Sequence, residues 1–541
     1  MTRRDLLRMA AVGGGGAMLG AALGAEPSDR PAGAPPPQRP QSVDLAEATV
    51  ARLSAAMQAG TATAESLTEQ YLKRIAELDK AGPAVNAVIE TNPDAPAIAR
   101  ALDEERRAKG PRGPLHGIPV MVKDNLDTHD RMMTTAGSLA LVGSIAPRDS
   151  FIVKRLREAG AVLIGKTNLS EWANFRGSHS TSGWSGRGGL TKNPYALDRN
   201  PSGSSSGSAA AVAASFCAVA VGTETDGSII SPSTCCGIVG IKPTVGLVSR
   251  AGIIPISSSQ DTAGPMGRTV TDAAILLGAI AGIDPRDAAT EGSRDKAHAD
   301  YTPFLDPNGL RDARIGVVRK WFRPRGGKAD AVMNAALETM KRQGAVLVEI
   351  PDIAAIDKID GAEYQVMLYE FKAGLNAYFA TLADSTPIRV LADLIAFNER
   401  NAEKELAYFG QETLVKAQEK GPLSDKAYTD ALEKCRKLSR DEGIDAAMNE
   451  HQLDALVAPS GGPAGKTDLI YGDRDVGGSS TAAAVSGYPS ITVPAGNVMG
   501  LPLGISFFGR AYSEPVLLRV AYAFEQATKA RIAPRFLASI G

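Results

Sequence analysis

The chain has 541 residues, a formal net charge of -1 and a hydrophobic fraction of 44%. This length is enough for two or three ordinary domains or for one large domain with a sizeable core. The near-neutral charge gives no reason to expect a nucleic acid or an anionic membrane as a partner. The four cysteines form no Cys-x-x-Cys pair, so we expect neither a metal site nor a disulfide framework.

The N-terminus has the layout of an export signal. Arg3 and Arg4 form a twin-arginine pair, and a mildly apolar run rich in Gly and Ala continues to about residue 25. This layout predicts a twin-arginine signal peptide over residues 1–25 and a periplasmic or secreted protein. A membrane anchor is not expected, because the run is short and rich in glycine. Residues 26–43 are Pro-rich, which is typical of a disordered linker.

The remaining chain alternates between helical and strand-like patterns. Residues 44–109 show helical periodicity, and residues 117–125 form a short apolar strand that ends in charged residues. Further expected elements are helices over 151–159, 271–281 and 515–528, strands over 161–164, 245–254, 453–458, 489–494 and 504–508, and a strand–helix–strand unit over 313–350. Residues 353–450 look helical and amphipathic, as expected for a cap that contributes to a substrate pocket. Because there is no linker after residue 43, we expect one large α/β domain over 44–541.

Two segments rich in Gly and Ser dominate the centre of the sequence. They cover residues 203–208 and 226–233, and a run of small apolar residues, 209–221, lies between them. Glycine lets backbones approach closely and adopt positive φ, and serine supplies hydroxyl groups. A flexible linker would lack the apolar run. We therefore expect two turns that face each other, with hydroxyl and N–H groups converging between them.

These segments favour hydrolysis without histidine. The chain has five histidines, and none lies in either segment. Lys123, at the end of the 117–125 strand, can replace histidine as the base if burial lowers its pKa, although a lone lysine there would ordinarily be solvated. Consecutive N–H groups around 226–228 can form an oxyanion hole. The residues thus permit acyl transfer by a serine with lysine as the base, but their spacing leaves open which serine attacks.

Two motif matches suggest other chemistries. Residues 160–167 match the Walker A pattern, but their four middle residues are apolar and predict a buried strand, so we do not expect a phosphate loop. Residues 203–207 match the Gly-x-Ser-x-Gly pattern of α/β-hydrolases, with Ser205 as the nucleophile. That motif should follow a buried strand and needs a downstream histidine, whereas here it follows a polar loop and only His298 and His451 come later. This His-dependent hydrolase is the competing catalytic interpretation.

A longer set of motifs resembles the amidase signature family. The matching segments are 122–125 (VKDN), 165–168 (GKTN), 201–211 (PSGSSSGSAAA), 222–229 (GTETDGSI) and 242–244 (KPT), with Gly237 and Gly240. The resemblance extends from about residue 45 to the C-terminus. It implies a mixed, twisted central β-sheet covered by helices on both faces.

The resemblance also implies a Ser–cis-Ser–Lys triad. In this sequence Ser228 would be the nucleophile, Ser204 the serine that relays the proton, and Lys123 the base. The peptide bond between Gly203 and Ser204 would be cis, and Ser205 would support the relay. The implied oxyanion hole consists of the backbone N–H groups of Thr225, Asp226, Gly227 and Ser228. No cofactor or metal ion is implied.

Departures from the family pattern bear on the substrate. The family usually has Gly where this chain has Asp226 and often Arg where it has Ile230. The Asp-Gly-Ser-Ile form and residues 246–257 resemble the peptide amidase branch. We therefore expect an exported amidohydrolase that removes ammonia from peptide C-terminal amides. The alternatives are an amidase of other small or aryl amides, a non-enzymatic binding protein on the same scaffold and a glutamine amidotransferase subunit. The expected partner is the amide substrate, with neither nucleic acid nor membrane after signal cleavage.

Overall fold

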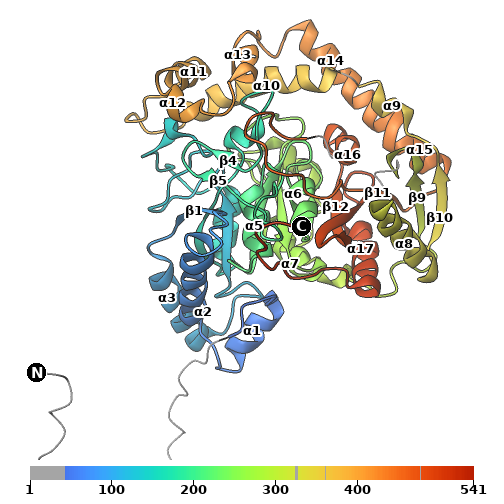
Figure 1. Ribbon diagram of the computed structural model, residues 1–541, viewed down its shortest axis with the longest axis horizontal. Coiled ribbons are helices and arrows are strands. Elements are labelled where there is room, and N and C mark those ends of the chain that lie inside the picture. Colours follow the sequence, from blue (N-terminus) through green and yellow to red (C-terminus); the bar gives the residue numbers. More distant parts are fainter. Residues whose placement is uncertain (1–42, 323–326, 360, 475–476, 541) are drawn as a thin grey trace, which may run out of the picture. The chain divides into compact units, whose positions relative to one another are not determined.

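A mixed β-sheet of 11 strands runs through the computed structural model, in the order β1-β3-β2-β6-β8-β7-β12-β13-β11-β9-β10 (Figure 1). The structure describes residues 43–322, 327–359, 361–474 and 477–540, all of which belong to one unit. Helices flank the sheet, and the prediction of one large α/β domain is confirmed. The expected signal peptide (1–25) and residues 26–42 of the expected linker lie outside the described residues.

The strands that matter most for function are the parallel neighbours β2 and β6. Val120 and Val122 of β2 pair with Val219 and Val221 of β6, so the carboxyl ends of both strands meet at the same edge of the sheet. The strands of this sheet are β1 (Val88–Thr91), β2 (Pro119–Lys123), β3 (Val162–Thr167), β6 (Val219–Glu224), β7 (Val239–Lys242), β8 (Thr262–Gly267), β9 (Arg314–Val318), β10 (Val346–Ile350), β11 (Ala455–Pro459), β12 (Ser490–Val498) and β13 (Leu501–Phe508). A separate two-stranded sheet consists of β4 (Trp184–Ser185) and β5 (Gly189–Leu190).

Helix α5 (Ser206–Ala213) is buried along its whole length and consists of small residues. Small side chains let its backbone pack closely against the sheet, where it contacts β1, β2, β3, β6 and β8. The other helices of this part are α1 (Val50–Gln58), α2 (Ala64–Arg74), α3 (Ala95–Lys109), α4 (Phe151–Glu158), α6 (Ile230–Cys235), α7 (Val270–Ile280), α8 (Lys328–Arg342), α16 (Ser480–Ser486) and α17 (Glu514–Thr528). No helix within the described ranges is long and apolar enough to cross a bilayer.

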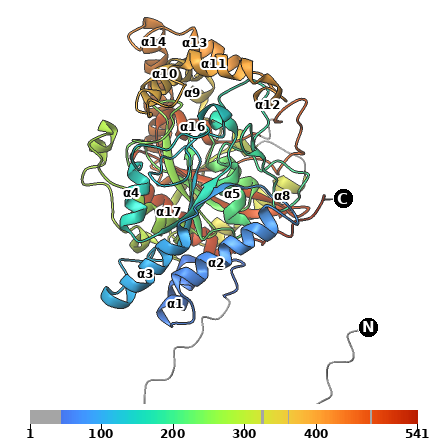
Figure 2. The same ribbon diagram turned by 90° about the vertical axis from the view of Figure 1, so that its left-hand side faces the viewer.

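Residues 353–450 are mostly helical, as predicted, and we call them the cap. They contain α9 (Ala354–Asp357), α10 (Ala362–Phe379), α11 (Leu391–Arg400), α12 (Ala402–Glu405), α13 (Glu412–Gln418), α14 (Lys426–Arg436) and α15 (Asp445–Glu450). Figures 1 and 2 show this arc of helices at the end of the molecule opposite α1–α3. Apolar residues of α10, including Phe371 and Leu375, share a core with Trp172 and Phe175 of the body. An ion pair of 2.6 Å between buried Arg176 and Glu171 lies beside Glu405 of α12.

The strand prediction was wrong in two ways, because it placed a strand over 245–254 and it missed β1, β6, β7 and β8, of which β1 lies in the segment expected to be helical. Residues 245–254 form turns rather than a strand, with Gly246 and Gly252 at φ angles of 90° and 81°. Positive φ interrupts an extended chain, and glycine adopts it without steric cost. Conversely, β8 was not expected, because Thr-Ala-Gly-Pro-Met-Gly contains few residues that favour strands. It is nevertheless buried between β6 and β7, where the ladders on both sides hold it.

Candidate active site

Lys123 lies at the carboxyl end of β2 and is completely buried. Its Nζ donates hydrogen bonds to Ser204 Oγ and to Thr223 Oγ1, each at 2.8 Å. Burial lowers the pKa of this lysine to about 7, against the opposing effect of Asp261 and Glu224. Lys123 is therefore poised to exchange a proton near neutral pH, as a general base requires.

Ser204 stands at the turn that leads into α5. The peptide bond between Gly203 and Ser204 is cis, as the resemblance implied. A Cβ atom on residue 203 would lie 2.2 Å from Ser170 Oγ, so any residue other than glycine would have to displace that hydroxyl group. Ser170 N in turn donates to Ser204 O at 3.1 Å. The turn thus presents the Ser204 hydroxyl to Lys123.

Ser205 connects the first Gly/Ser-rich segment to the second. Its Oγ donates to Thr223 O at 3.0 Å and accepts from Thr223 N at 3.1 Å. Its backbone N donates to Ser228 O at 3.1 Å. The buried hydroxyl therefore ties the first segment to the end of β6, the backbone N–H ties it to the second segment, and the expected part of Ser205 in the proton relay stays a prediction.

Ser228 belongs to the loop between β6 and α6. The loop is fixed by Glu224, whose Oε2 accepts from Ile229 N at 2.6 Å and from Ile230 N at 2.9 Å. Gly227, at a φ of 80°, provides the sharp turn before Ser228. Among the described residues, none accepts a hydrogen bond from the N–H groups of the four predicted oxyanion-hole residues. These four donors are thus unoccupied, as a site for a developing oxyanion requires.

The structure brings the predicted residues into one region without joining all of them. Lys123 is bonded to Ser204, and Ser228 is bonded through its carbonyl group to Ser205. Within this described region no hydrogen bond links the hydroxyl groups of Ser204 and Ser228. The catalytic assignment of these residues stays a prediction.

The competing motifs behave differently. In the Walker A match, residues 162–167 form strand β3, and the buried Lys166 Nζ donates to Leu126 O at 2.6 Å and to Thr134 Oγ1 at 3.0 Å. For the hydrolase match, His451 lies against Glu450 and His298 packs against Tyr301. Across the described chain, which includes all five histidines, none is hydrogen-bonded to a serine of the two central segments. The described residues also contain no cluster of side chains suited to a metal ion.

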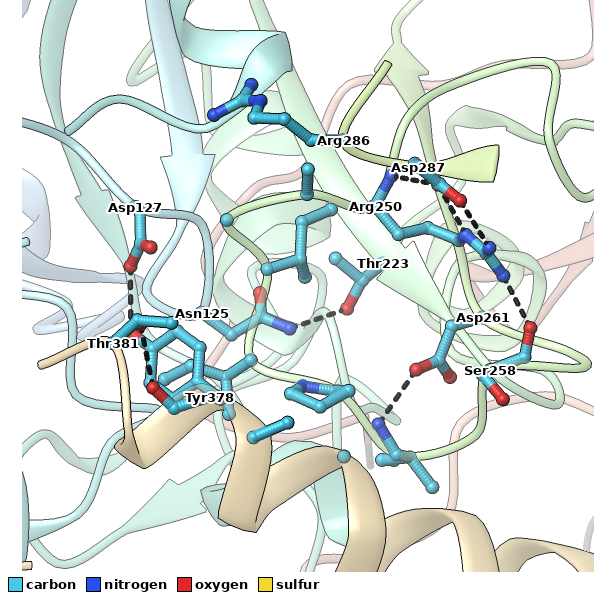
Figure 3. Close-up of a pocket in the computed structure, with 18 of the residues that line it drawn as sticks. Asn125, Asp127, Thr223, Arg250, Ser258, Asp261, Arg286, Asp287, Tyr378 and Thr381 are labelled. Atoms are coloured by element: carbon cyan, nitrogen blue, oxygen red, sulfur yellow. Dashed lines mark hydrogen bonds and ion pairs between the residues drawn. The ribbon is translucent and has the colours of Figure 1, made fainter. Parts of the chain in front are cut away.

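A cavity of about 480 Å³ adjoins this region (Figure 3). Thr223 and Thr225 line it on the side of the predicted triad, and residues 253–256 and α10 supply apolar walls. Its polar lining consists of Asn125, Asp127, Arg148, Arg250, Ser258, Asp261, Thr262, Arg286, Asp287, Tyr378 and Thr381. Lys123, Ser204 and Ser228 are not part of the lining, so the cavity reaches the triad only at its edge. Tyr378 Oη of α10 donates to Asp127 Oδ1 at 2.8 Å.

Sequence reasoning missed several groups around the oxyanion loop, which we define as residues 225–228. Asp261 accepts from Thr225 Oγ1 at 2.6 Å and from the backbone N of Ile256 and Ser257. Burial raises the pKa of Asp261 to about 6. Thr223 is a second partner of Lys123, because its Oγ1 accepts a hydrogen bond from Lys123 Nζ. The one local signal in the sequence is that Asp261 follows the Ser-rich run 257–259. No hydrophobic periodicity distinguishes Asp261 or Thr223 from their neighbours.

Comparison with known proteins identifies the family of the chain. The family model described as Amidase matches residues 66–518. A protein of Arabidopsis thaliana named "Probable amidase" is 45% identical, with 91% of this chain and 92% of that protein covered. The crystal structure of the native peptide amidase from Stenotrophomonas maltophilia is 54% identical and superposes with a TM-score of 0.86, covering 91% of this chain and 99% of that one. A glutamyl-tRNA(Gln) amidotransferase subunit of Halorhodospira halophila is 36% identical, with 89% and 97% covered.

The fold and the matched sequence define a hydrolase of amide C–N bonds. The chain belongs to the amidase family, and within it the chain is similar to the peptide amidases.

Proposed function

We propose that this amidase releases ammonia from peptide C-terminal amides through an acyl-enzyme on Ser228. The observation that carries the proposal is the bond of 2.8 Å between Lys123 Nζ and Ser204 Oγ in a fully buried setting. A lysine that is neutral near pH 7 can accept a proton from the serine it contacts. Ser204 can then take the proton of Ser228, whose loop lies alongside.

The proposed reaction has two halves. Ser228 Oγ attacks the amide carbon as its proton passes through Ser204 to Lys123, and the N–H groups of the oxyanion loop stabilise the negative oxygen that forms. The same relay returns the proton to the leaving nitrogen, the C–N bond breaks and ammonia departs. Water then attacks the ester carbon, gives its proton to the relay and releases Ser228 and a carboxylic acid.

The proposed substrate class is supported by the cavity and by the comparisons. A volume of about 480 Å³, with apolar walls and charged groups at its edges, suits a short peptide with mixed side chains. A peptide amidase in complex with the competitive inhibitor chymostatin is 54% identical, with a TM-score of 0.87. The glutamyl-tRNA(Gln) amidotransferase subunit from Thermotoga maritima is 28% identical, with a TM-score of 0.67. These values favour a peptide amidase over a glutamine amidotransferase subunit. Export through the twin-arginine signal remains part of the proposal.

A substrate panel tests the proposed function. We would compare peptide amides, the matching free peptides, aryl amides and glutamine, using ammonia or arylamine release as the measurement. We expect kcat/KM to be highest for peptide amides and the free peptides to remain intact. A preference for glutamine, or co-purification with a partner that consumes ammonia, would instead support the amidotransferase alternative. A preference for aryl amides would support the broader amidase.

The Ser228→Ala variant separates catalysis from binding in the same panel. We expect it to lose amide hydrolysis by several orders of magnitude while it still binds peptide amides. Unchanged hydrolysis by this variant would contradict the assignment of Ser228 and would leave the non-enzymatic scaffold or another nucleophile to be considered.

A further inference from the structure

Two carboxyl groups meet beside the nucleophile loop. Asp226 lies in the oxyanion loop, and Glu363 lies in the first turn of α10, in the cap. A side-chain hydrogen bond joins them. Because a carboxylate can only accept hydrogen bonds, one member of the pair must carry a proton.

The surroundings identify Glu363 as the protonated member. Asp226 Oδ2 accepts from Thr481 Oγ1 at 2.7 Å. Burial raises the pKa of Asp226, and the hydroxyl groups of Ser480 and Thr481, which donate hydrogen bonds to this carboxyl group, oppose that rise and favour its ionised form. Burial, together with the neighbouring Asp226, raises the pKa of Glu363 to about 8, so Glu363 is protonated at neutral pH.

Gln260 ties the same glutamate to a second residue of the loop. Its Nε2 donates to Glu363 Oε1 at 2.9 Å and lies 3.5 Å from Thr225 O. Glu363 therefore holds Asp226 directly and Thr225 through Gln260. Both of these loop residues contribute N–H groups to the predicted oxyanion hole. Since α10 also lines the cavity, the pair connects the cap to the oxyanion loop.

We propose that Glu363, in its protonated form, is a positioning residue that fixes the oxyanion loop, and that loss of its proton releases the loop. The inference rests on the proposed role of Ser228 and its loop. Ionised Glu363 would face ionised Asp226 at hydrogen-bond distance in a poorly solvated region, and the two carboxylates would repel. The N–H groups of the oxyanion loop would then lose their alignment.

The consequence is a loss of kcat at alkaline pH. The proton is present below the pKa of Glu363, about 8, and is lost as the pH rises through that value. Other titratable groups act on the pair. Lys242 of β7 and Glu224 of β6 interact with Asp226, and Cys435 of α14 interacts with Glu363. Burial lowers the pKa of Lys242 to about 8, so a test must distinguish it from Glu363.

The Glu363→Gln variant makes that distinction, because its amide can still donate to Asp226 but cannot ionise. We expect kcat at pH 7 to fall by less than about tenfold and the alkaline decline of kcat to disappear. We expect Glu363→Ala, which removes the donor, to lower kcat by about 10- to 100-fold with a much smaller effect on KM. Glu370→Gln is the control, since Glu370 is a buried glutamate of α10 that bonds Ser257 and Tyr428 instead. It should keep the alkaline decline.

Asp226→Asn provides a second variant if Glu363→Gln fails to fold. The amide of Asn can donate a hydrogen bond to ionised Glu363, so no repulsion between carboxylates develops and the alkaline decline of kcat should disappear in this variant as well. An unmodified enzyme without an alkaline decline, or a decline unmoved in both variants, would overturn the inference and assign any such decline to Lys242. This failure is distinct from failure of the proposed function, which would show as amide hydrolysis by Ser228→Ala.

Discussion

Lys123 Nζ lies 2.8 Å from Ser204 Oγ at the carboxyl end of β2, in a region closed to solvent. The pairing of β2 with β6 fixes Lys123, and the turn before α5 presents Ser204. Two residues 81 positions apart in the sequence therefore lie at hydrogen-bond distance. The backbone bond from Ser205 N to Ser228 O brings the oxyanion loop, whose four N–H groups have no acceptor among the described residues, into the same region as the predicted base and relay.

The pH dependence of kcat/KM should report the state of Lys123. Its pKa is lowered to about 7, so the base is protonated and inactive below that value and neutral above it. We expect kcat/KM to rise by about tenfold for each pH unit up to the pKa of Lys123, to level off above it, and to fall again above the pKa of Glu363, about 8. Steady-state kinetics across the acidic range measure this. A profile that stays flat to strongly acidic pH would contradict the role of Lys123.

Replacing Lys123 with Met should trade activity for stability. The variant loses the base, so we expect kcat/KM to fall by several orders of magnitude. The lowered pKa of Lys123 means that the unfolded chain binds a proton that the folded chain excludes between about pH 7 and 10. Keeping Lys123 neutral in the folded state therefore lowers the free energy of unfolding at pH 7. Met has no proton to exclude, so the variant should unfold at a higher temperature at pH 7. A lower melting temperature with retained secondary structure would show that the lysine stabilises the fold.

The neighbouring serines should respond differently to alanine. Ser204→Ala removes the proposed relay, and we expect kcat to fall by about 10²- to 10⁴-fold with little change in the free energy of unfolding. Ser205→Ala removes the two contacts with Thr223, and we expect it to lower the free energy of unfolding by about 1–3 kcal/mol. Urea denaturation and kinetics on both variants measure this. We expect Ser205→Ala to keep more activity than Ser204→Ala. If Ser205 were the nucleophile, Ser205→Ala would be the less active variant.

His451→Ala addresses the His-dependent hydrolase directly. His451 is near Glu450 and is not bonded to any serine of the central segments, all of which lie in the described chain. We expect its kcat/KM to match that of the unmodified enzyme. Loss of activity with an unchanged melting temperature would revive the hydrolase interpretation.

Tyr378→Phe tests whether the cavity beside the triad takes the substrate. The change removes the bond of 2.8 Å to Asp127 and leaves an ionisable carboxyl group without its donor in the cavity wall. If peptide amides occupy the cavity, KM should rise by about three- to tenfold while kcat changes little. Kinetics with a series of peptide amides of increasing length measure this. If the change in KM were the same for the shortest and the longest peptide amides, the peptide would bind outside this cavity.

The sequence predicted the fold class and most of the elements, because periodicity marks long helices and apolar strands. It missed β1, β6, β7 and β8. The Gly and Pro residues of β8 oppose a strand, which burial between two neighbouring strands nevertheless stabilises. The family resemblance named Lys123, Ser204 and Ser228, whereas residue reasoning alone left the attacking serine open. Neither approach found the contacts of Glu363 and Asp261 with the oxyanion loop. Such contacts depend on how distant segments pack, which leaves no local pattern in the chain.

Mapping the covalent intermediate tests the central claim most directly. The enzyme would be mixed with a peptide ester that acylates faster than it is hydrolysed, quenched in acid, digested and analysed by mass spectrometry, with Ser228→Ala as the control. We predict one acyl adduct on the peptide that contains Ser228 and none in the variant. An adduct on Ser204 or Ser205, or an adduct that persists in Ser228→Ala, would contradict the account.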